Sequence, residues 1–287
     1  MLKSIQPTVL CFDVEWIPDP KAAEVLHYVD LSEPGNELEA FETLWKEEGK
    51  ADEKNPQPYL KTILCRIVSI AGIVREKNMG KVSLRLFSMP TDPDDPEKCE
   101  EARILSGFIR AVGEKKPQIV GYNSANADLP IITQRAIIHG LSAPGFAERP
   151  NKPWEGVDYF DSRNSEYNVD LCPMLGRFAQ TPSLHQAASL SGIPGKMGVS
   201  GASVAELWLE GKTREIVEYN EYDAFTTFLL WARVAHFANL LSDQQYADEQ
   251  RLTRELLEQE IAGGKEHLVP YVEEWDRLRE LTGQADI

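Results

Sequence analysis

Two carboxylates lie within an apolar, strand-like run near the start of the chain, in the stretch LCFDVEWIPD at residues 10–19. Successive side chains of a strand point to opposite faces. One face of this run is therefore uniformly large and apolar, and it consists of Leu10, Phe12, Val14 and Trp16. The other face carries Asp13 and Glu15, so both anions point the same way from one end of the strand. Because their repulsion and desolvation are costly, this strand end must be open to water or covered by a positive group.

An α/β fold is indicated by the order of apolar runs and turn residues along the rest of the chain. Residues 17–60 form an acidic insertion after the first strand, with short helices expected at 22–29 and 38–47. A hairpin turning at KNMG, an amphipathic helical pattern in DPDDPEKCEEARILSGFIRAVGEKK, a short buried strand and the helix DLPIITQRAIIHG follow. The chain is then loop-rich at 141–182 and helical beyond it. We expect a mixed sheet flanked by helices.

The net charge of −16 at first counts against a nucleic-acid partner. The acids are concentrated, however, because residues 19–54 hold 11 acids and 4 bases, and residues 243–287 hold 12 acids and 5 bases. The remainder is nearly neutral, and residues 61–85 carry six bases against Glu76 alone. The charge is thus compatible with a nucleic-acid substrate without supporting one. The basic stretch could equally be a solvated hairpin, and the acidic stretches are expected to be solvated helices, with partner binding as the alternative.

Nothing in the sequence predicts a membrane protein or a disulfide-bonded one. The longest apolar candidate, FLLWARVAHFANLL, is interrupted by Arg233, His236 and Asn239. The N-terminal stretch reaches Asp13 before a signal-peptide core could form. The four cysteines are scattered and include no CxxC pair, which argues against a zinc site and a disulfide framework. We therefore expect a cytoplasmic protein without a membrane partner.

Two further acids could join the pair on the first strand. Asp128 begins a helix directly after a buried strand, where α/β proteins often place functional groups, although an Asp there is more often a plain helix N-cap. Tyr219 and Asp223 are four residues apart on a long helix and therefore share one face. Such pairs are usually structural or solvated, so each signal is weak when it stands alone.

Together and in this order, the motifs resemble those of the DEDD-type 3′–5′ exonucleases of the ribonuclease H-like superfamily. The motifs are D-x-E on the first strand, GYNSANADLP at a strand-to-helix junction, and Y-x-x-x-D on a late helix, where the tyrosine marks the Tyr subgroup. The chain is most similar to predicted exonucleases related to the proofreading domain of family B DNA polymerases, through DLCPML, LSGIPGKMGVSGASVAELW and EIVEYNEYDAFTTFLLWAR. The resemblance covers about residues 8–235. It implies an exonuclease domain at 1–242, interrupted by the 17–60 insertion, and a helical C-terminal extension at 243–287.

This resemblance implies a catalytic site built from four metal-binding carboxylates and one tyrosine. The carboxylates are Asp13, Glu15, Asp128 and Asp223. Tyr219 would position the attacking water. Two Mg²⁺ or Mn²⁺ ions, about 3.5–4 Å apart, would stabilise both the nucleophile and the leaving group, and such hard cations prefer oxygen ligands. A bridging dication would offset the repulsion on the first strand. The chain departs from the family at Ala127, where the family usually has an aromatic residue. The sequence alone does not show which residue supports the nearby strand end or the substrate in its place.

Four residues are candidates for substrate binding. Asn123 matches an Asn of the family and could hold the terminal nucleotide or shape the turn. Asp170 in NVDL matches a family Asp near the site, whereas a loop Asp is usually a turn former. Lys196 could contact a phosphate, although a solvated lysine is commoner. Trp16 could stack on a terminal base, although its place on the apolar face favours the core.

We therefore predict a metal-dependent 3′–5′ exonuclease that releases nucleoside 5′-monophosphates from DNA, with single-stranded 3′ ends preferred because the end must be threaded unpaired. RNA is the nearest alternative substrate, because no motif reveals contacts to a 2′-hydroxyl. A non-catalytic nucleic-acid-binding module on the same fold is the other alternative. The sequence identifies no protein partner.

Overall fold

In the computed structural model of the chain, residues 2–33, 35–176, 180–197 and 203–283 are described. Their strands form one five-stranded sheet in the order β3-β2-β1-β4-β5. These strands are β1 (Thr8–Pro18), β2 (Cys65–Asn78), β3 (Lys81–Met89), β4 (Gln118–Gly121) and β5 (Asn168–Asp170). β2 pairs antiparallel with β1 and β3, whereas β4 is parallel to β1 and to β5. This mixed sheet confirms the predicted α/β, ribonuclease H-like fold.

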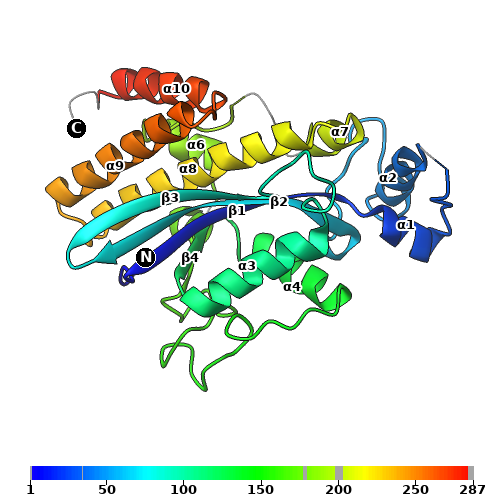
Figure 1. The fold of residues 1–287 in the computed structure, drawn as a ribbon, viewed down its shortest axis with the longest axis horizontal. Helices are drawn as coiled ribbons and strands as arrows, with labels where there is room; N and C mark the ends of the chain where they lie inside the picture. Colours follow the sequence, from blue (N-terminus) through cyan, green and yellow to red (C-terminus); the bar gives the residue numbers. More distant parts are fainter. Residues whose placement is uncertain (1, 34, 177–179, 198–202, 284–287) are drawn as a thin grey trace.

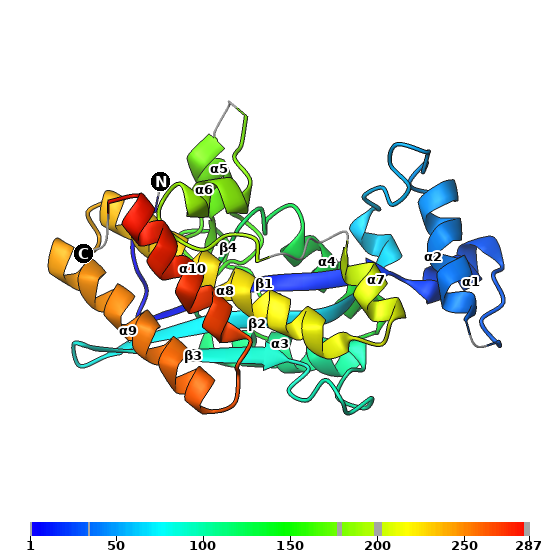
Figure 2. The same cartoon turned by 90° about the horizontal axis from the view of Figure 1, so that it is seen from above.

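Helices cover both faces of the sheet (Figures 1 and 2). α3 (Glu101–Lys115) and α4 (Asp128–Ile138) lie on one face, and the long helix α8 (Thr213–Phe237) crosses the other. α9 (Asp243–Ala262) lies beside α8 and contacts β3, and α10 (Leu268–Leu281) packs against both helices. The break between α9 and α10 falls at the AGG sequence. The shorter helices of the second half of the chain are α5 (Leu171–Gly176), α6 (Leu184–Ser189) and α7 (Val204–Leu209).

β1 separates two hydrophobic cores, because its side chains alternate between the two faces of the sheet. One face packs against α3 and α4 through Leu10, Phe12 and Val14. The opposite face packs against α8 in its first half, through Val9 and Cys11. That second face continues into Asp13 and Glu15, which point toward α8. The alternation predicted from the sequence thus directs both acids to the helix that carries the third motif.

Most of the 17–60 segment lies beyond one end of the sheet, although Ile17 and Pro18 still belong to β1 (Figures 1 and 2). The segment contains α1 (Pro20–His27) and α2 (Asn36–Glu47), which agree with the two expected helices, and a 3-10 helix η1 (Thr62–Leu64) follows it before β2. Phe41 and Leu44 of α2 are fully buried in the same core as the apolar face of β1. The segment is therefore packed onto the sheet, and its limits as an insertion, like those of the C-terminal extension, stay predictions.

A buried ion-pair network fixes the start of this segment to α4. The guanidinium of Arg135 donates to Asp19 at 2.6 Å and to both carboxylate oxygens of Glu101 at 2.6 and 2.8 Å. All three side chains are buried. Glu101 also accepts the backbone N–H of Ile67 at 2.7 Å. Because the network joins α4, α3, β2 and the first residues after β1, it holds the helix of Asp128 in register with the sheet.

A second cluster anchors α8 next to its functional motif. Glu221 is 1% exposed, and its carboxylate accepts a hydrogen bond from Ser88 of β3 at 2.6 Å. It also accepts from Lys265 and lies 2.8 Å from Nε2 of His267, both in the α9–α10 connection. Burial raises the pKa of Glu221, but these partners outweigh it and hold the pKa below its usual value. The connection between α9 and α10 therefore fixes α8 only two residues before Asp223.

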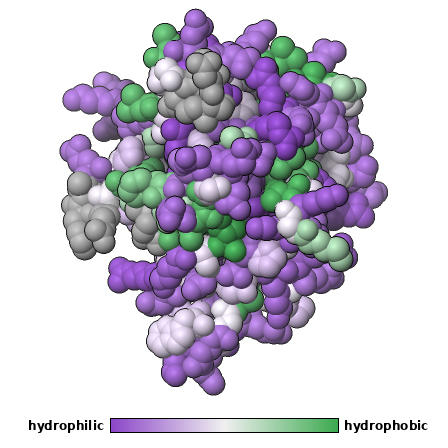
Figure 3. Space-filling model, turned by 90° about the vertical axis from the view of Figure 1, so that its left-hand side faces the viewer, coloured by the Kyte–Doolittle hydropathy of each residue, from purple (hydrophilic) through white to green (hydrophobic). Residues whose placement is uncertain are grey.

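The bases of the 61–85 stretch have different environments in the fold. Arg75 is buried and donates to Glu249 of α9 at 2.6 and 2.8 Å, so it is not available to a polyanion. Lys77, Lys81 and Arg85 are exposed near the β2–β3 turn, at the end of the sheet opposite α1 and α2. The surface at this end is largely hydrophilic, with apolar side chains in separate patches (Figure 3). These bases therefore belong to a solvated hairpin.

Two elements differ from the sequence-based expectation. The helical pattern expected from residue 92 begins only at Glu101, because Asp92 and Asp95 accept the backbone N–H groups of Asp94 and Glu97 and form turns that compete with a helix. The loop-rich region at 141–182 contains β5, a strand of only three residues. Such a length is too short for an alternating pattern to be visible in the sequence.

Within the described ranges, no helix combines the length and apolar character needed to cross a membrane. The four cysteines carry free thiols, and they are Cys11, Cys65, Cys99 and Cys172. Burial raises the pKa of the Cys65 thiol to about 12, so this thiol stays protonated at neutral pH.

Candidate active site

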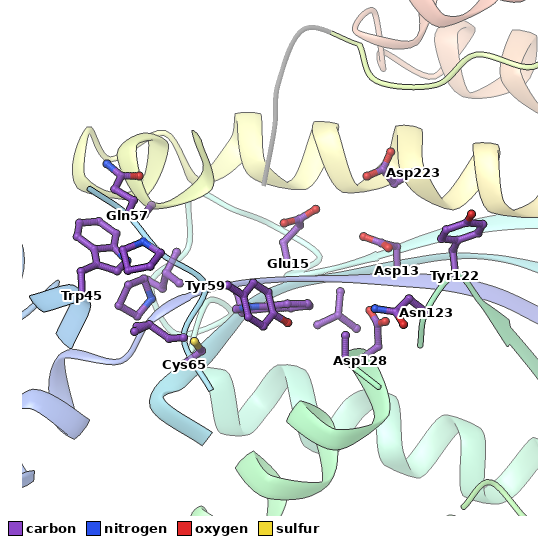
Figure 4. Close-up of a pocket in the computed structure, with 18 residues that line it drawn as sticks. Asp13, Glu15, Trp45, Gln57, Tyr59, Cys65, Tyr122, Asn123, Asp128 and Asp223 are labelled. Atoms are coloured by element: carbon purple, nitrogen blue, oxygen red, sulfur yellow. The ribbon is translucent and has the colours of Figure 1, made fainter. Parts of the chain in front are cut away.

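Three elements bring the four predicted acids to one cleft (Figure 4). Asp13 and Glu15 come from β1, Asp223 comes from α8, and Asp128 is the first residue of α4. One carboxylate oxygen from each of Asp13, Glu15 and Asp223 lies within 4.8 Å of the others. Asp128 faces the same cleft from the side of α4. Sequence positions more than 200 residues apart thus meet at a single acidic site.

The structure excludes the plain N-cap interpretation of Asp128. The N-cap position of α4 belongs to Ala127, and no side chain caps the helix. The carboxylate of Asp128 instead faces the cleft, where the backbone N–H groups of Asp128 itself and of Val14 on β1 bond to it. Because one of these donors lies on β1, the carboxylate is held beside the strand that carries the first two acids.

The cleft is strongly acidic and has a volume of about 460 Å³, within the range of about 300–1,000 Å³ found for small-molecule sites. Among the described residues that line it, none is a lysine or an arginine. Burial raises the pKa of Asp13 and Glu15 well above the usual range, and the neighbouring carboxylates add to this effect. Burial likewise raises the pKa of Asp128 to about 7 and that of Asp223 to about 6.

The donor set fits a divalent metal ion. A cluster of buried and half-buried carboxylates without a lining cation is costly when it is ionised. A dication would offset that cost, and carboxylate oxygens are the ligands that Mg²⁺ and Mn²⁺ prefer. Lys196, which is exposed and lies outside the lining, only partly compensates by lowering the pKa of Glu15 and Asp223. The three oxygens of Asp13, Glu15 and Asp223 are therefore the clearest candidates for metal ligands.

Tyr219 lies one helical turn before Asp223 and is 4% exposed. Its hydroxyl bonds to the Asp223 carboxylate, which lowers the pKa of that acid against the effect of burial. Burial, together with the nearby carboxylates, raises the pKa of Tyr219 far above its usual value. The phenol is therefore protonated at neutral pH and serves as a hydrogen-bond donor at the edge of the acidic site.

The turn between β4 and α4 is held by Asp170, which is 2% exposed. Its carboxylate accepts the backbone N–H groups of Asn123, Ala125 and Cys172 at 2.8, 3.1 and 3.0 Å. Asn123 has a left-handed backbone with φ of 60° and lines the cleft. Because backbone donors occupy the carboxylate of Asp170, we assign this residue a positioning role, whereas Asn123 faces the space where a substrate would lie.

The loop that carries Lys196 is attached to the helices around it. The backbone N–H of Lys196 donates to Nδ1 of His185 at 3.0 Å. The hydroxyl of Thr226, three residues after Asp223, donates to the carbonyl of Pro194 at 2.9 Å. These bonds hold the loop next to α8. The part of the family-like segment at 198–202 lies outside the described residues.

Trp16 stays with the apolar face of β1 and also lines the cleft. The pairing of β1 with β2 shifts between Glu15 and Trp16, and the extra residue, Val68, lies in β2. The alternation along β1 itself therefore continues. Trp16 is half-buried and packs against the core that also holds Phe12 and Val14. At the edge of that core it forms part of the cleft lining as well.

Further lining residues come from the 17–60 segment and were not anticipated from the sequence. Trp45, Pro58, Tyr59 and Leu60 form an apolar end of the cleft, beside the acids. The only local signal was the NPQPY stretch, which reads as a turn because prolines favour turns. Its position over the acidic strand depends on how the segment folds back onto β1. The periodicity of apolar residues in the sequence does not predict that folding.

Binding of Mg²⁺ is expected to raise the Tm of metal-stripped protein by roughly 5 °C at pH 8 and by much less at pH 5. The folded-state pKa values of Asp128 and Asp223, about 7 and about 6, exceed the unfolded value of about 3.9. At a pH between the unfolded and the folded pKa values, the folded state therefore binds more protons than the unfolded state. The metal-free protein loses stability as the pH rises through this window. Metal at about 100 times its Kd would add about 2.7 kcal/mol. Calorimetric melting at both pH values checks this, and an equal gain at both would contradict it.

Comparison with known proteins adds independent information. The model of a family described as predicted 3′–5′ exonucleases related to the exonuclease domain of PolB matches residues 57–275. The matched region contains Asp128, Tyr219 and Asp223, whereas β1 lies outside it, so the place of Asp13 and Glu15 in the site rests on geometry.

Among solved structures, the chain is similar to the family B DNA polymerase from the hyperthermophilic archaeon Pyrobaculum calidifontis, with 19% sequence identity and a TM-score of 0.46. The similarity covers 80% of this chain and 24% of the polymerase, so the chain spans about a quarter of that protein. No curated protein matches the chain.

Proposed function

Since the chain belongs to the family of predicted 3′–5′ exonucleases related to the exonuclease domain of PolB, we propose that it hydrolyses single-stranded DNA from the 3′ end in a metal-dependent reaction. The products would be nucleoside 5′-monophosphates. The observation that carries this proposal is the convergence of Asp13, Glu15 and Asp223 on one point, with Asp128 across the cleft.

Metal dependence follows from the charge of the cleft. A phosphodiester is an anion, and it would be repelled by four carboxylates in a cleft whose described lining contains no base. Two Mg²⁺ or Mn²⁺ ions bound there would activate a water molecule and stabilise the departing 3′ oxygen. The rigid strand β1 would supply two of their ligands and α8 a third, while Asp128 would complete the set from α4.

The chain's own residues would orient the reaction. Tyr219 donates to Asp223 and so fixes the orientation of that carboxylate. As a protonated phenol next to the acids it could also hold the water that attacks the phosphate, which is the role we propose for it. Asn123 lines the cleft on a turn that Asp170 fixes, and would meet the terminal nucleotide. Lys196 is near enough to the acids to affect their pKa and would neutralise a substrate phosphate.

Replacing Tyr219 with phenylalanine is expected to lower kcat about 10- to 100-fold with little change in KM. The ring still fills its buried position, while the donor to Asp223 and to the water is lost, and removal of such supporting groups at metal sites has effects of about this size. Steady-state kinetics on a 5′-labelled oligonucleotide measures both constants. Unchanged kcat would show that the hydroxyl takes no part in the reaction.

DNA is favoured over RNA because the related exonuclease domain belongs to a DNA polymerase family. The decisive experiment uses 5′-labelled single-stranded DNA and RNA of the same sequence, incubated with Mg²⁺, Mn²⁺ or EDTA. A ladder that shortens one nucleotide at a time from the 3′ end, on DNA and only with metal, supports the proposal. Faster degradation of RNA would reassign the substrate, and binding of either without cleavage would indicate a non-catalytic module. The cytoplasmic location stays a prediction.

A further inference from the structure

The cleft has two chemically different ends. The acids occupy one part of it, and the aromatic and apolar side chains of the 17–60 segment occupy the other (Figure 4). Tyr59 is labelled between Trp45 and Glu15 in this view. A nucleotide has the same division, because its phosphate is charged and its base has two flat, apolar faces. A terminal nucleotide with its phosphate at the acids would therefore place its base beside the aromatic end.

Tyr59 is held in a position that presents its ring to the cleft. The ring is 70% exposed, although an aromatic side chain gains stability from burial. Its two neighbours in the sequence, Pro58 and Leu60, are both buried and so fix the backbone on either side. The ring centroid of Tyr59 lies 6.4 Å from that of Trp16, with the planes at 83°. The ring is thus anchored by its backbone and by an edge contact, while most of the residue stays exposed.

The start of α4 leaves room in the cleft for a base. Ala127, which lines the cleft directly before Asp128, contributes only a methyl group. This residue therefore offers no ring for stacking, whereas Tyr59 offers one from a different element. Burial and the charge of Asp128 raise the pKa of Tyr59, which shows that its phenol is within electrostatic reach of the acidic end.

We propose that Tyr59, supported edge-on by Trp16, is the stacking platform for the base of the 3′-terminal nucleotide. This inference rests on the proposed exonuclease function, and it adds a specificity-determining residue that the 17–60 segment supplies. Every base has a flat face, so stacking tolerates all sequences, and a tyrosine loses little conformational entropy on binding. The site would accept any base and discriminate against a terminal sugar that lacks one.

The test compares two 5′-labelled oligonucleotides that differ only at the 3′ end, where one carries a normal nucleotide and the other a stable abasic analogue. For the wild-type protein, kcat/KM on the abasic end is expected to be lower by about 5- to 150-fold, the range that corresponds to stacking of one base. Tyr59→Ala should reduce activity on the normal end and remove most of this difference. Tyr59→Phe, which keeps the ring, should preserve the difference.

Tyr28→Ala is the matched control, because Tyr28 lies in the same segment, is 90% exposed and is not among the residues that line the cleft. It should behave as the wild-type protein does on both ends. An equal preference for the normal end in the wild-type protein and in Tyr59→Ala would overturn the proposal while leaving the exonuclease intact. Circular dichroism would confirm that each variant is folded.

A binding measurement distinguishes a failure of the stacking proposal from a failure of the exonuclease proposal. An oligonucleotide ending in 2-aminopurine is titrated with protein in Ca²⁺, which takes the same oxygen ligands as Mg²⁺ with looser geometry. Stacking should quench its fluorescence with the wild-type protein and Tyr59→Phe, and much less with Tyr59→Ala. Such quenching without any cleavage in Mg²⁺ or Mn²⁺ would support the platform and reject the exonuclease. Equal quenching by wild type and Tyr59→Ala, or none by either, would reject the platform.

Discussion

Replacing Asp13 with asparagine is expected to lower the rate of hydrolysis at least about a thousandfold, a loss of about 4 kcal/mol of transition-state stabilisation. Asp13 is one of three residues whose carboxylate oxygens lie within 4.8 Å of one another. The amide of asparagine has nearly the same shape but carries no charge, so a dication at this point would lose an anionic ligand while the strand stays intact. Single-turnover rates on a 5′-labelled oligonucleotide measure the effect.

The same substitution is expected to raise the Tm of the metal-free protein at pH 8. Burial and the other acids raise the pKa of Asp13 above the unfolded value of about 3.9, so this group makes the folded state less stable as the pH rises above that unfolded value. Asparagine removes this cost. At pH 5 the wild-type acids bind protons, and the two proteins should melt at more similar temperatures. A variant that is inactive but more stable distinguishes a functional residue from a structural one.

The control for both measurements is Glu53→Gln, which removes an exposed acid from the 17–60 segment, away from the residues that line the cleft. It should change neither the rate nor the Tm, because exposed charges contribute little to stability. If Asp13→Asn retains more than a tenth of the wild-type rate, Asp13 is not an essential metal ligand and the site as described is wrong.

Replacing Arg135 with methionine is expected to lower the free energy of unfolding by about 3–5 kcal/mol, the cost of leaving buried charges without their partner. The guanidinium makes three hydrogen bonds to Asp19 and Glu101, and all three side chains are buried. Methionine fills similar space but removes the guanidinium that pairs with both carboxylates. Asp19 then keeps only the backbone N–H of Lys21, and Glu101 keeps the backbone N–H of Ile67 and the contact with His139. Urea denaturation followed by circular dichroism gives the difference in free energy.

The loss is expected at neutral pH, where the two carboxylates are ionised and the guanidinium that paired with them is missing. Arg163→Met, which removes an exposed arginine, should change the free energy of unfolding by less than about 0.5 kcal/mol. A loss for Arg135→Met no larger than that of this control would show that the network contributes nothing to the fold.

The sequence predicts the acidic strand well because strand periodicity is a local property. Side chains alternate with a period of two whatever the strand packs against, so Asp13 and Glu15 had to share a face. The meeting of these acids with Asp128 and Asp223 is different in kind. Their positions along the chain do not show that they lie close together in the fold. Their meeting at one site was predicted only because the order of the motifs resembles that of a known family.

The features that the sequence did not predict depend on tertiary packing. Trp16 lines the cleft as well as packing against the core because of the residues that surround the end of β1. Tyr59 reaches the cleft because the 17–60 segment folds back over the strand. The positioning role of Asp170 appears only when β5 places its carboxylate beneath the turn at Asn123. In each case the residue type was visible, but its partner was distant in the sequence.

The most direct test of the central claim, that the acids of β1, α4 and α8 hold catalytic cations, is a titration of metal-stripped protein with Mn²⁺ followed by electron paramagnetic resonance. We predict that the wild-type protein binds two Mn²⁺ ions whose spins are coupled, and that Asp13→Asn loses at least one of them together with the coupling. Wild-type protein that binds no Mn²⁺, or an Asp13→Asn variant that binds both ions as tightly as the wild type, would contradict the account.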